Sequence, residues 1–358
     1  MRNDFFENND KLNALEAQYE AQKIAFSPIV FQVARTMRDL NLLEILSKNK
    51  NGLTYEELAK ESTLSKYAVQ VLCETALSAN IVSLKDEKVF LTKIGFFINS
   101  DKMTITNMNY NHHVNYLGLF YLDEAIKNEK AEGLKVFGDW ETIYPALSTL
   151  PNDAKKSWFE FDHMYSDSGF KEAIKILKEL KPEKILDIGG NTGKFAMLFA
   201  QSNPEIEITI MDLPQQIKLA KQNIYEKDIK SISTYEANIL LEDTTIPKGF
   251  DIIWMSQFLD CFKEEQIVKI LEKIYASMDN NSEICIMEPF WDRQNNETAA
   301  FCVINTSPYF TAMANGYSKM FKYTDFEKLL KKANLKVVEI IDNIGLCQTI
   351  IRCEKISR

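Results

Sequence analysis

A glycine-rich turn between two apolar segments is the part of the chain best suited to hold a ligand. The apolar run Lys184–Ile188 leads directly into Gly189–Gly193, which reads GGNTG. Phe195–Ala200 follows with the apolar character of a helix, so the order is strand, tight turn, helix, which opens a nucleotide-binding α/β sheet. Asp212 closes the next candidate strand, Ile206–Met211, at about the 20-residue spacing where a carboxylate binds ribose hydroxyls.

The spacing of the glycines narrows the kind of nucleotide that this turn could bind. The pattern is not G-x-G-x-x-G, and no Lys-Ser or Lys-Thr pair follows the last glycine, so it matches neither a dinucleotide fingerprint nor a P-loop. The order D-x-G-G-x-T-G from Asp187, with an acid after the second strand, resembles motif I of class I S-adenosylmethionine (SAM) methyltransferases. The alternatives are a glycine turn in an ordinary α/β domain and a site for NAD.

Seven apolar runs in the second half of the chain have the length and composition of β-strands, and helical patterns separate most of them. This alternation predicts an α/β fold with a mostly parallel, Rossmann-like sheet and helices on both faces. The last two runs are joined only by Asp342–Gly345, a loop that permits an antiparallel hairpin and forbids a parallel crossover. A seven-stranded sheet that ends in such a hairpin is also what the methyltransferase resemblance implies. The runs are Lys184–Ile188, Ile206–Met211, Ser231–Tyr235, Phe250–Met255, Glu283–Glu288, Leu335–Ile341 and Leu346–Cys353, and the helical patterns include Gln215–Ile224, Glu264–Ser277 and Tyr323–Ala333.

The first third of the chain has the pattern of a mainly helical winged-helix domain. Thr54 and Glu57 have the spacing of a helix N-cap and its capping-box partner, and Ser65 can cap the next helix. The expected elements are a helix over Leu40–Leu46, a second from Thr54, a third from Ser65 to about Leu77, and a hairpin wing formed by Ile81–Leu84 and Lys88–Thr92.

Two functions are open for this winged helix. DNA binding through its third helix would need a basic surface, but that helix carries Lys66 and Glu74 and little else that is charged. Residues 1–110 also hold about as many acids as bases. Dimerisation is the alternative, because the amphipathic segment Ala21–Met37 has an apolar face that can pack on a partner or within one chain. That face consists of Ile24, Phe26, Ile29, Val30, Val33 and Met37.

Composition limits the classes of function further. The 358 residues are long for one domain, and a hydrophobic content of 46% predicts packed cores instead of disorder. A net charge of −9 argues against nucleic acid as the main partner. The six cysteines include no C-x-x-C pair, so we expect buried thiols in a reducing compartment and no metal site. Because no signal-peptide core and no apolar window of about 18 residues is present, we expect a cytoplasmic protein without a membrane segment.

A winged-helix dimerisation domain followed by a SAM domain resembles the caffeate and hydroxyindole O-methyltransferase family over nearly the whole chain. The tetrapeptide Met211–Pro214 matches its ribose motif, Phe161 and Met164 fall near its acceptor-lining segment, and Glu288 matches an acid beside its catalytic site. The resemblance implies a homodimer that uses SAM on a small aromatic acceptor. It divides the chain into a dimerisation domain (1–108), a helical connector that lines the acceptor pocket (109–170) and a SAM-binding domain (171–358). It places SAM against Asp187, Gly189, Gly190, Gly193, Asp212, Leu213, Asn238, Ile239 and Ser256.

The chain departs from this family at several positions. Asp260 stands where the family has the histidine that activates the acceptor, and Ser256 stands where a lysine is often found. Ala237-Asn238-Ile239 replaces a Gly-Asp-Phe motif that contacts adenine, and Met320 lies at or near a third family carboxylate. The resemblance therefore implies that most of the SAM site is kept and that the usual catalytic base is lost.

The replaced histidine leaves three candidates for the catalytic residue. Methyl transfer from SAM requires mainly alignment, and a base helps only where the nucleophile must lose a proton, as a phenol with a pKa of about 10 does. Asp260 could accept that proton if burial raised its pKa, Glu288 could orient the acceptor or share the task, and His163 could act as the base instead. The structural alternatives are an N-cap for a helix near Lys263, a strand-end acid before Pro289, and a packed or solvated histidine.

The segment from Glu288 to Phe321 is dense in aromatic residues and methionine. One of its faces is expected to line a flat, apolar cavity, which favours an aromatic or polyunsaturated acceptor over a charged metabolite. An apolar helix over Tyr110–Tyr121 could form the roof, and its adjacent histidines, His112 and His113, point apart and make a weak metal pair. The predicted acceptor contacts are Phe161, Met164, Trp254, Trp291, Tyr309 and Met313.

Three functional hypotheses follow from these patterns. The leading one is a homodimeric, metal-independent SAM methyltransferase that acts on an oxygen of a small aromatic acceptor. The second keeps the fold and methylates carbon or nitrogen, or uses SAM without methylating. The third is a non-catalytic, ligand-sensing regulator that uses the winged helix. The acidic charge balance of the chain argues against this third hypothesis.

Overall fold

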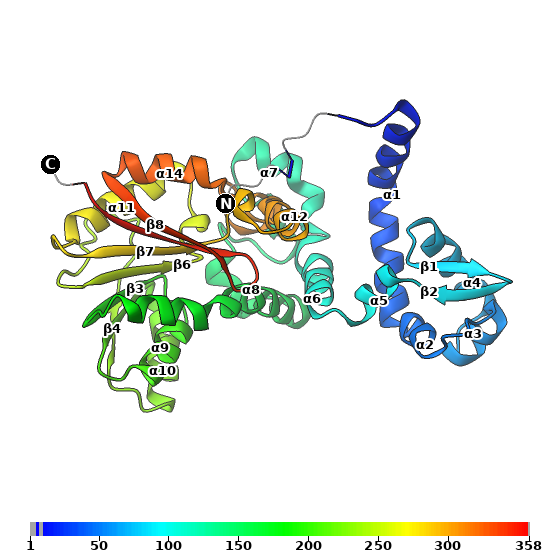
Figure 1. Cartoon of the computed structure of the whole chain (residues 1–358), viewed down its shortest axis with the longest axis horizontal. Coiled ribbons are helices and arrows are strands. Elements are labelled where there is room, and N and C mark those ends of the chain that lie inside the picture. The colour runs from blue at the N-terminus through cyan, green and yellow to red at the C-terminus, as the bar shows by residue number, and fades with distance from the viewer. Residues whose placement is uncertain (1–4, 7–9, 357–358) are drawn as a thin grey trace. The chain divides into compact units, whose positions relative to one another are not determined.

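A computed structural model describes residues 5–6 and 10–356, which form two compact units (Figure 1). Residues 10–112 make up the N-terminal unit, and residues 5–6 and 113–356 make up the second unit. The N-terminal unit therefore reaches four residues beyond the boundary expected at 108. The second expected boundary, at 170, falls inside one continuous helix, α8 (Asn152–Glu179). Gly169 does not break that helix, because it lies against the sheet, where an added Cβ would come within 3.2 Å of Met287 and 3.1 Å of Ile344.

The N-terminal unit has the helices and the hairpin wing that the sequence predicts. The Thr54 hydroxyl accepts a hydrogen bond from the Glu57 amide (3.2 Å), and the Glu57 carboxylate accepts one from the Thr54 amide (2.8 Å). Ser65 Oγ accepts from the Ala68 amide (3.1 Å), so both predicted helix starts are confirmed. The elements are α1 (Ala14–Asp39), α2 (Leu42–Lys48), α3 (Tyr55–Ser62), α4 (Lys66–Ser78), the antiparallel β1 (Val82–Lys85) and β2 (Lys88–Leu91), α5 (Lys93–Ser100) and α6 (Lys102–Tyr110).

Helix α1 is longer than the predicted segment because Asn13 caps it in a capping box with Glu16. Ala34 and Met37, near its end, are buried in the core of this unit. Ile24, Phe26 and Ile29 are exposed, along with several apolar side chains from the first turns of the helix. Within the unit, the apolar face predicted for this helix is therefore covered only at its C-terminal end.

The second unit is built on a seven-stranded sheet with the order β5-β4-β3-β6-β7-β9-β8. Strands β3 to β7 are parallel, and β9 runs antiparallel to both β7 and β8, which confirms the predicted terminal hairpin. Because β8 continues to Ile344, the connection between β8 and β9 is even shorter than expected. The strands are β3 (Lys184–Ile188), β4 (Glu207–Asp212), β5 (Ile232–Glu236), β6 (Ile252–Ser256), β7 (Glu283–Glu288), β8 (Leu335–Ile344) and β9 (Gln348–Lys355). The helices are α7 (Leu122–Asn128), α8, α9 (Lys194–Ser202), α10 (Pro214–Glu226), α11 (Glu264–Ser277), α12 (Glu297–Ile304), α13 (Ser307–Tyr309) and α14 (Tyr323–Lys332).

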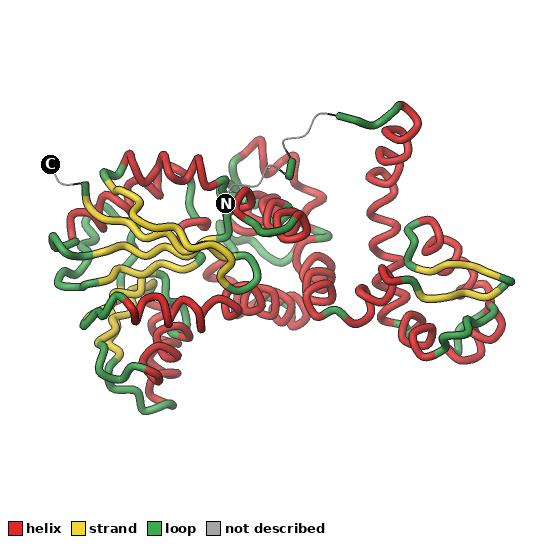
Figure 2. Tube along the Cα trace, viewed as in Figure 1, coloured by secondary structure: helices red, strands yellow, loops and turns green. Residues whose placement is uncertain are grey.

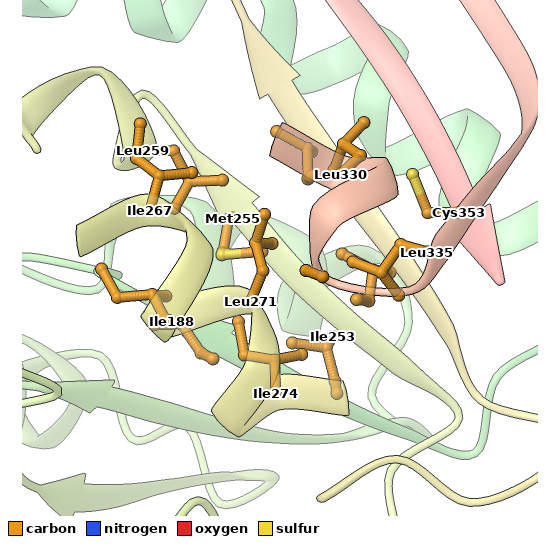
Figure 3. Close-up of a cluster of buried hydrophobic side chains, with 14 of the residues drawn as sticks. Ile188, Ile253, Met255, Leu259, Ile267, Leu271, Ile274, Leu330, Leu335 and Cys353 are labelled. Atoms are coloured by element: carbon orange, nitrogen blue, oxygen red, sulfur yellow. The ribbon is translucent and has the colours of Figure 1, made fainter. Parts of the chain in front are cut away.

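Helices cover both faces of this sheet, with the strands between them (Figure 2). On one face, α11 and α14 pack on alternate strand residues such as Ile253 and Met255 (Figure 3). On the other face, α8, α9 and α10 pack on Ile252 and Trp254. Two apolar layers thus hold the carboxyl ends of the parallel strands at one edge, where ligands bind in such sheets.

The helix expected over Tyr110–Tyr121 is not continuous. Helix α6 ends at Tyr110, a π-helical turn spans Asn111–Asn115, and a 3-10 turn spans Gly118–Tyr121. Gly118 packs so closely on Met313 that an added Cβ would lie 1.9 Å from the sulfur. The segment contains Asn111, Asn115 and Gly118, and asparagine and glycine are poor helix formers. No helix of the described residues is long and apolar enough to cross a membrane.

Candidate functional site

The glycine turn adopts a backbone conformation that other residues could not take without strain. Gly189 and Gly193 have φ angles of +76° and +81°. The Gly189 amide donates to the Met211 carbonyl (2.9 Å), so the turn is fixed against the end of β4. A Cβ on Gly189 would lie 2.3 Å from the Phe258 ring, and a Cβ on Gly190 would lie 2.7 Å from Asp187 Oδ2. The turn therefore requires glycine both for its positive φ angles and for its close packing on Phe258 and Asp187.

Two carboxylates flank this turn. Asp187 is buried, its Oδ2 has no hydrogen-bond partner among the described residues, and burial followed by repulsion from Asp212 raises its pKa to about 8. Asp212 Oδ2 accepts from the Asn191 amide (2.8 Å) and Oδ1 from the Leu213 amide (2.7 Å). Burial raises the pKa of Asp212, and these two bonds oppose the rise. Each carboxylate oxygen can accept two hydrogen bonds, so both acids keep capacity for a ligand.

The remaining residues predicted to hold the cofactor lie at the same edge of the sheet. Ser256 ends β6, and Asn238 follows β5, where its Oδ1 accepts from the Leu240 amide (3.1 Å). Ile239 packs into the core below Asn238, whereas Leu213 after β4 is 37% exposed. The Asp187 oxygen without a hydrogen-bond partner, the glycine turn and the adjacent acids at the ends of β3 and β4 fit a SAM site.

Glu288 ends β7 and holds the loop that follows β6. Its Oε1 accepts hydrogen bonds from the amides of Phe258 (3.0 Å) and Leu259 (2.8 Å). Its Oε2 is buried and has no hydrogen-bond partner in the described part of the chain. Burial, and then the charge of Asp260, raise the pKa of Glu288 well above its ordinary value. Glu288 is therefore more than a strand-end acid, because it fixes the loop that carries Asp260.

Asp260 lies in a 3-10 turn, Leu259–Cys261, and is 5% exposed. Burial raises its pKa, and the Cys261 thiol, a weak donor, contacts Oδ1 at 3.5 Å. Helix α11 begins at Glu264 with Lys263 as the N-cap, so the alternative that Asp260 caps this helix is wrong. Asp260 and Glu288 thus form a buried, mutually repelling pair of carboxyl groups.

Aromatic side chains with hydrogen-bonded polar groups adjoin Asp260. Asn315 Nδ2 donates to the Tyr144 hydroxyl (3.4 Å) and to the Cys261 carbonyl (2.9 Å). Burial, together with Cys261, Tyr309 and then Asp260, raises the pKa of Tyr144 well above its ordinary value. Tyr309, a predicted acceptor contact, accepts a hydrogen bond from Trp158 Nε1 (2.6 Å).

Helix α8 brings an acid toward this pair that sequence reasoning missed. Burial, followed by Asp167 and Asp260, raises the pKa of Asp162 to about 7. His163 is the next residue of the helix. Burial and the charge of Lys194 lower its pKa. Its ring centroid lies 5.9 Å from that of Phe159. The charges that act on the pKa of His163 are those of Lys194 and Asp167, whereas the charge of Asp260 acts on the pKa of Asp162. The signal available in the sequence was the four-residue spacing from Trp158 to Asp162 on one helix face.

The other predicted acceptor contacts lie in different surroundings. Trp254 is fully buried and stacks on Phe195 (ring centroids 4.8 Å apart), and Met313 is enclosed against Gly118, which argues against an acceptor-lining role for either. Phe161 and Met164 lie partly buried on α8, where the Phe161 ring packs on Tyr165 (4.8 Å). Trp291 occupies the 3-10 turn Trp291–Arg293, with the Lys322 ammonium 5.2 Å from its ring. Among the residues that the structure describes, no group of three or more His, Cys, Asp or Glu could hold a metal ion.

Comparison with known proteins identifies the family. Residues 18–89 match the Dimerisation2-like domain, and residues 120–336 match the O-methyltransferase domain. The L-tyrosine C(3)-methyltransferase of Streptomyces lavendulae is 23% identical, over 87% of this chain and 84% of that protein.

Solved structures show the same fold. The SAM-dependent methyltransferase SibL in its apo form aligns with a TM-score of 0.71 at 20% identity, over 94% of this chain and 98% of that one. Human N-acetylserotonin methyltransferase in complex with SAM aligns with a TM-score of 0.64 at 16% identity, over 98% and 100% of the two chains. Because residues 120–336 match the O-methyltransferase domain, the chain belongs to this family and is a SAM-dependent methyltransferase.

Proposed function

We propose that the enzyme methylates a small phenolic acceptor at oxygen and that Asp260 accepts the phenol proton. The observation that carries this proposal is the buried pair of Asp260 and Glu288 at the ends of β6 and β7. The pair lies at the same edge of the sheet as the glycine turn, and Phe258 contacts both, because its amide binds Glu288 and its ring lies over Gly189. This arrangement supports our proposal of a base beside the donor site.

The glycine turn and its acids fit SAM. Gly189, Gly190 and Gly193 would leave room for the methionine part next to Asp187, and Asp212 would bind the ribose hydroxyls. Leu213, Asn238, Ile239 and Ser256 complete the proposed cofactor site. When bound, SAM supplies a methyl group on a positively charged sulfur, which needs no further activation.

Asp260 and Glu288 would have different roles toward the acceptor. Because burial raises the pKa of Asp260, its carboxylate is a stronger base than an exposed aspartate, and it can take the hydroxyl proton as the oxygen becomes nucleophilic. Two carboxyls that repel each other titrate as a unit, so we expect the pair to share one proton near neutral pH. Glu288 then acts by holding the Phe258–Leu259 backbone in place.

The first experiment is calorimetry with SAM and S-adenosylhomocysteine, followed by transfer of a labelled methyl group to a panel of phenols. We expect both nucleosides to bind and the label to appear in an aryl methyl ether. If neither nucleoside bound, the proposed chemistry would be refuted.

Methylation of a ring carbon is a second candidate, which the S. lavendulae relative favours because that protein is an L-tyrosine C(3)-methyltransferase. Removing the phenol proton also raises electron density at the neighbouring carbon, so the same base could serve both outcomes. Product analysis by mass spectrometry and NMR separates them. A methyl group on a ring carbon of the product would contradict methylation at oxygen, and a methyl ether would support it.

We also propose that the enzyme is a homodimer. The match to a Dimerisation2-like domain and the exposed apolar residues Ile24, Phe26 and Ile29 of α1 support this assembly. Ile24→Asp should shift the sedimentation coefficient toward the monomer, because a charge would enter an apolar contact. Glu20→Gln on the same helix is the matched control and should leave the dimer intact. A monomeric natural protein at micromolar concentration would contradict the proposal.

A further inference from the structure

The turn that carries Asp260 is held on both sides by hydrogen bonds from distant segments of the chain. Before Asp260, two backbone amides donate to the Glu288 carboxylate. After it, the Cys261 carbonyl accepts a hydrogen bond from Asn315 Nδ2 (2.9 Å). Asp260 thus lies between two anchors, one at Glu288 and one at Asn315.

The side chain of Asn315 is buried, and its orientation is fixed. It is 2% exposed, and Oδ1 accepts from the backbone amides of Tyr317 (3.1 Å) and Ser318 (3.0 Å). Because these amides can only donate, the oxygen must face them, and Nδ2 must face the Cys261 carbonyl. The second N–H of Nδ2 has an acceptor in Ser318 Oγ (2.8 Å), and the Tyr144 hydroxyl lies further away at 3.4 Å. All four hydrogen-bonding positions of this amide are therefore occupied.

The backbone on either side of Asn315 is also constrained. Asn315 follows the π-helical turn Phe310–Ala314, whose last carbonyl accepts from the Ile143 amide (2.9 Å). Gly316 has a φ angle of +92°, and an added Cβ there would lie 2.4 Å from Lys130 Cα. Asn315 is therefore a fixed point against which the turn of Asp260 can be held.

Asp260 needs such a support because its own carboxylate is held weakly. The Cys261 thiol, a weak donor, contacts Oδ1 at 3.5 Å. A general base must lie within about 3.2 Å of the atom from which it takes a proton. A displacement of about 1 Å can lower a rate by about 100-fold. The geometry of the turn therefore decides whether Asp260 reaches an acceptor hydroxyl.

We propose that Asn315 is a positioning residue for methyl transfer, which holds the Cys261 carbonyl and thereby fixes the place of Asp260. The inference rests on the proposed function, because it takes Asp260 as the base. Asn315 touches neither the acceptor nor SAM in this proposal, so its loss should act on the reaction only through Asp260.

Hydrogen exchange measured by mass spectrometry tests this anchor without an acceptor. In Asn315→Ala, the amides of residues 258–262 should exchange about tenfold faster, as expected for the loss of one or two hydrogen bonds. If alanine prevents folding, Asn315→Asp removes the same donors and keeps an acceptor for the two backbone amides, and it should give the same acceleration.

Asn203→Ala is the matched control. Asn203 is 1% exposed, and its Nδ2 donates to the Phe199 carbonyl (3.1 Å), so this substitution also removes a buried amide that binds a carbonyl. Asn203 follows α9 and precedes β4, which places it at the opposite edge of the sheet from Asp260. The control should leave the exchange of residues 258–262 unchanged.

Kinetics test whether the anchor serves the reaction. Labelled methyl transfer is measured with catechol, 4-methylphenol and L-tyrosine, and kcat is determined for the phenol that reacts fastest. Asn315→Ala should lower kcat by about 10- to 100-fold and leave S-adenosylhomocysteine affinity within about threefold. In an Asp260→Asn background, the same substitution should lower the remaining rate by less than about threefold, because residues that act through one group are not additive. Asn203→Ala should retain the kcat of the natural protein.

Unchanged exchange over residues 258–262, an unchanged kcat, or an equal fall of kcat in both backgrounds would each overturn the inference and leave the proposed function standing. An unchanged kcat in Asp260→Asn would overturn the base and this inference with it. Transfer to none of the three phenols would contradict the phenolic acceptor, and the exchange measurement would still decide whether Asn315 holds the turn.

Discussion

Replacing Glu288 by glutamine removes a charge and keeps the acceptor that two backbone amides need. In the natural protein, Oε1 accepts from Phe258 (3.0 Å) and Leu259 (2.8 Å), and a glutamine Oε1 can do the same. Glu288→Ala removes both bonds and leaves two amides without their acceptor. The two variants therefore separate the charge of this side chain from its structural role.

The expected magnitudes follow from the raised pKa of Glu288. Above the unfolded pKa of about 4.3 and up to the folded pKa, the folded state holds a proton that the unfolded state has lost, so the free energy of unfolding falls as pH rises. The slope for one proton is about 1.4 kcal/mol per pH unit. Glu288→Gln lacks this proton, so we expect its stability relative to the natural protein to grow with pH through that window. Glu288→Ala should be about 2 to 6 kcal/mol less stable than Glu288→Gln, at about 1 to 3 kcal/mol for each unpaired amide.

Urea unfolding followed by tryptophan fluorescence can measure this in the intact chain. All four tryptophans, at positions 140, 158, 254 and 291, lie in the unit from His113 onward, so the signal reports on the unit that contains the site. The comparison is made at pH 5, 6.5 and 8. If the stability of Glu288→Gln relative to the natural protein did not increase from pH 5 to pH 8, the argument from buried repulsion would be refuted.

Three further substitutions test the site. Gly189→Ala should abolish S-adenosylhomocysteine binding measured by calorimetry, because it adds a clash with Phe258 to a left-handed backbone, whereas Gly249→Ala, with a φ of +87° and nothing within 4 Å, should leave binding unchanged. Asp212→Asn should weaken the same binding by about tenfold, through loss of a charge-assisted bond to ribose, and equal affinity would remove Asp212 from the site. Asp260→Asn should lower kcat by about 100-fold or more while leaving S-adenosylhomocysteine affinity within about threefold, and an unchanged kcat would exclude Asp260 as the base.

The fold was largely predictable because its determinants are local. Buried parallel strands are continuous apolar runs, and capping residues such as Thr54 and Ser65 mark helix starts within four residues. The helix expected over Tyr110–Tyr121 was wrong as a continuous element, because the apolar pattern did not show the π-helical and 3-10 turns that interrupt it.

The site was predictable only in part. The glycine turn, Asp212, Asp260 and Glu288 follow strands directly, and parallel strands bring their carboxyl ends together. Asp162 was missed because a helix rotates by about 100° per residue, so only the packed orientation of α8 decides which of positions 162 and 163 is affected by the charge of Asp260. Trp254 was misplaced for a related reason, since a strand buried on both faces gives no alternation to show which side a residue occupies.

The position of β9 between β7 and β8 has a consequence for biosynthesis. Every residue of β7 except Glu283 is buried, and Glu288 lies opposite Thr349, which the ribosome adds 61 residues later. Until residues 348–355 have emerged, β7 is an apolar edge strand with unpaired amides, which is the kind of surface that recruits other chains. Slow translation or early termination within β8 would therefore yield an aggregation-prone intermediate, and chaperone binding to nascent chains should be strongest in that interval.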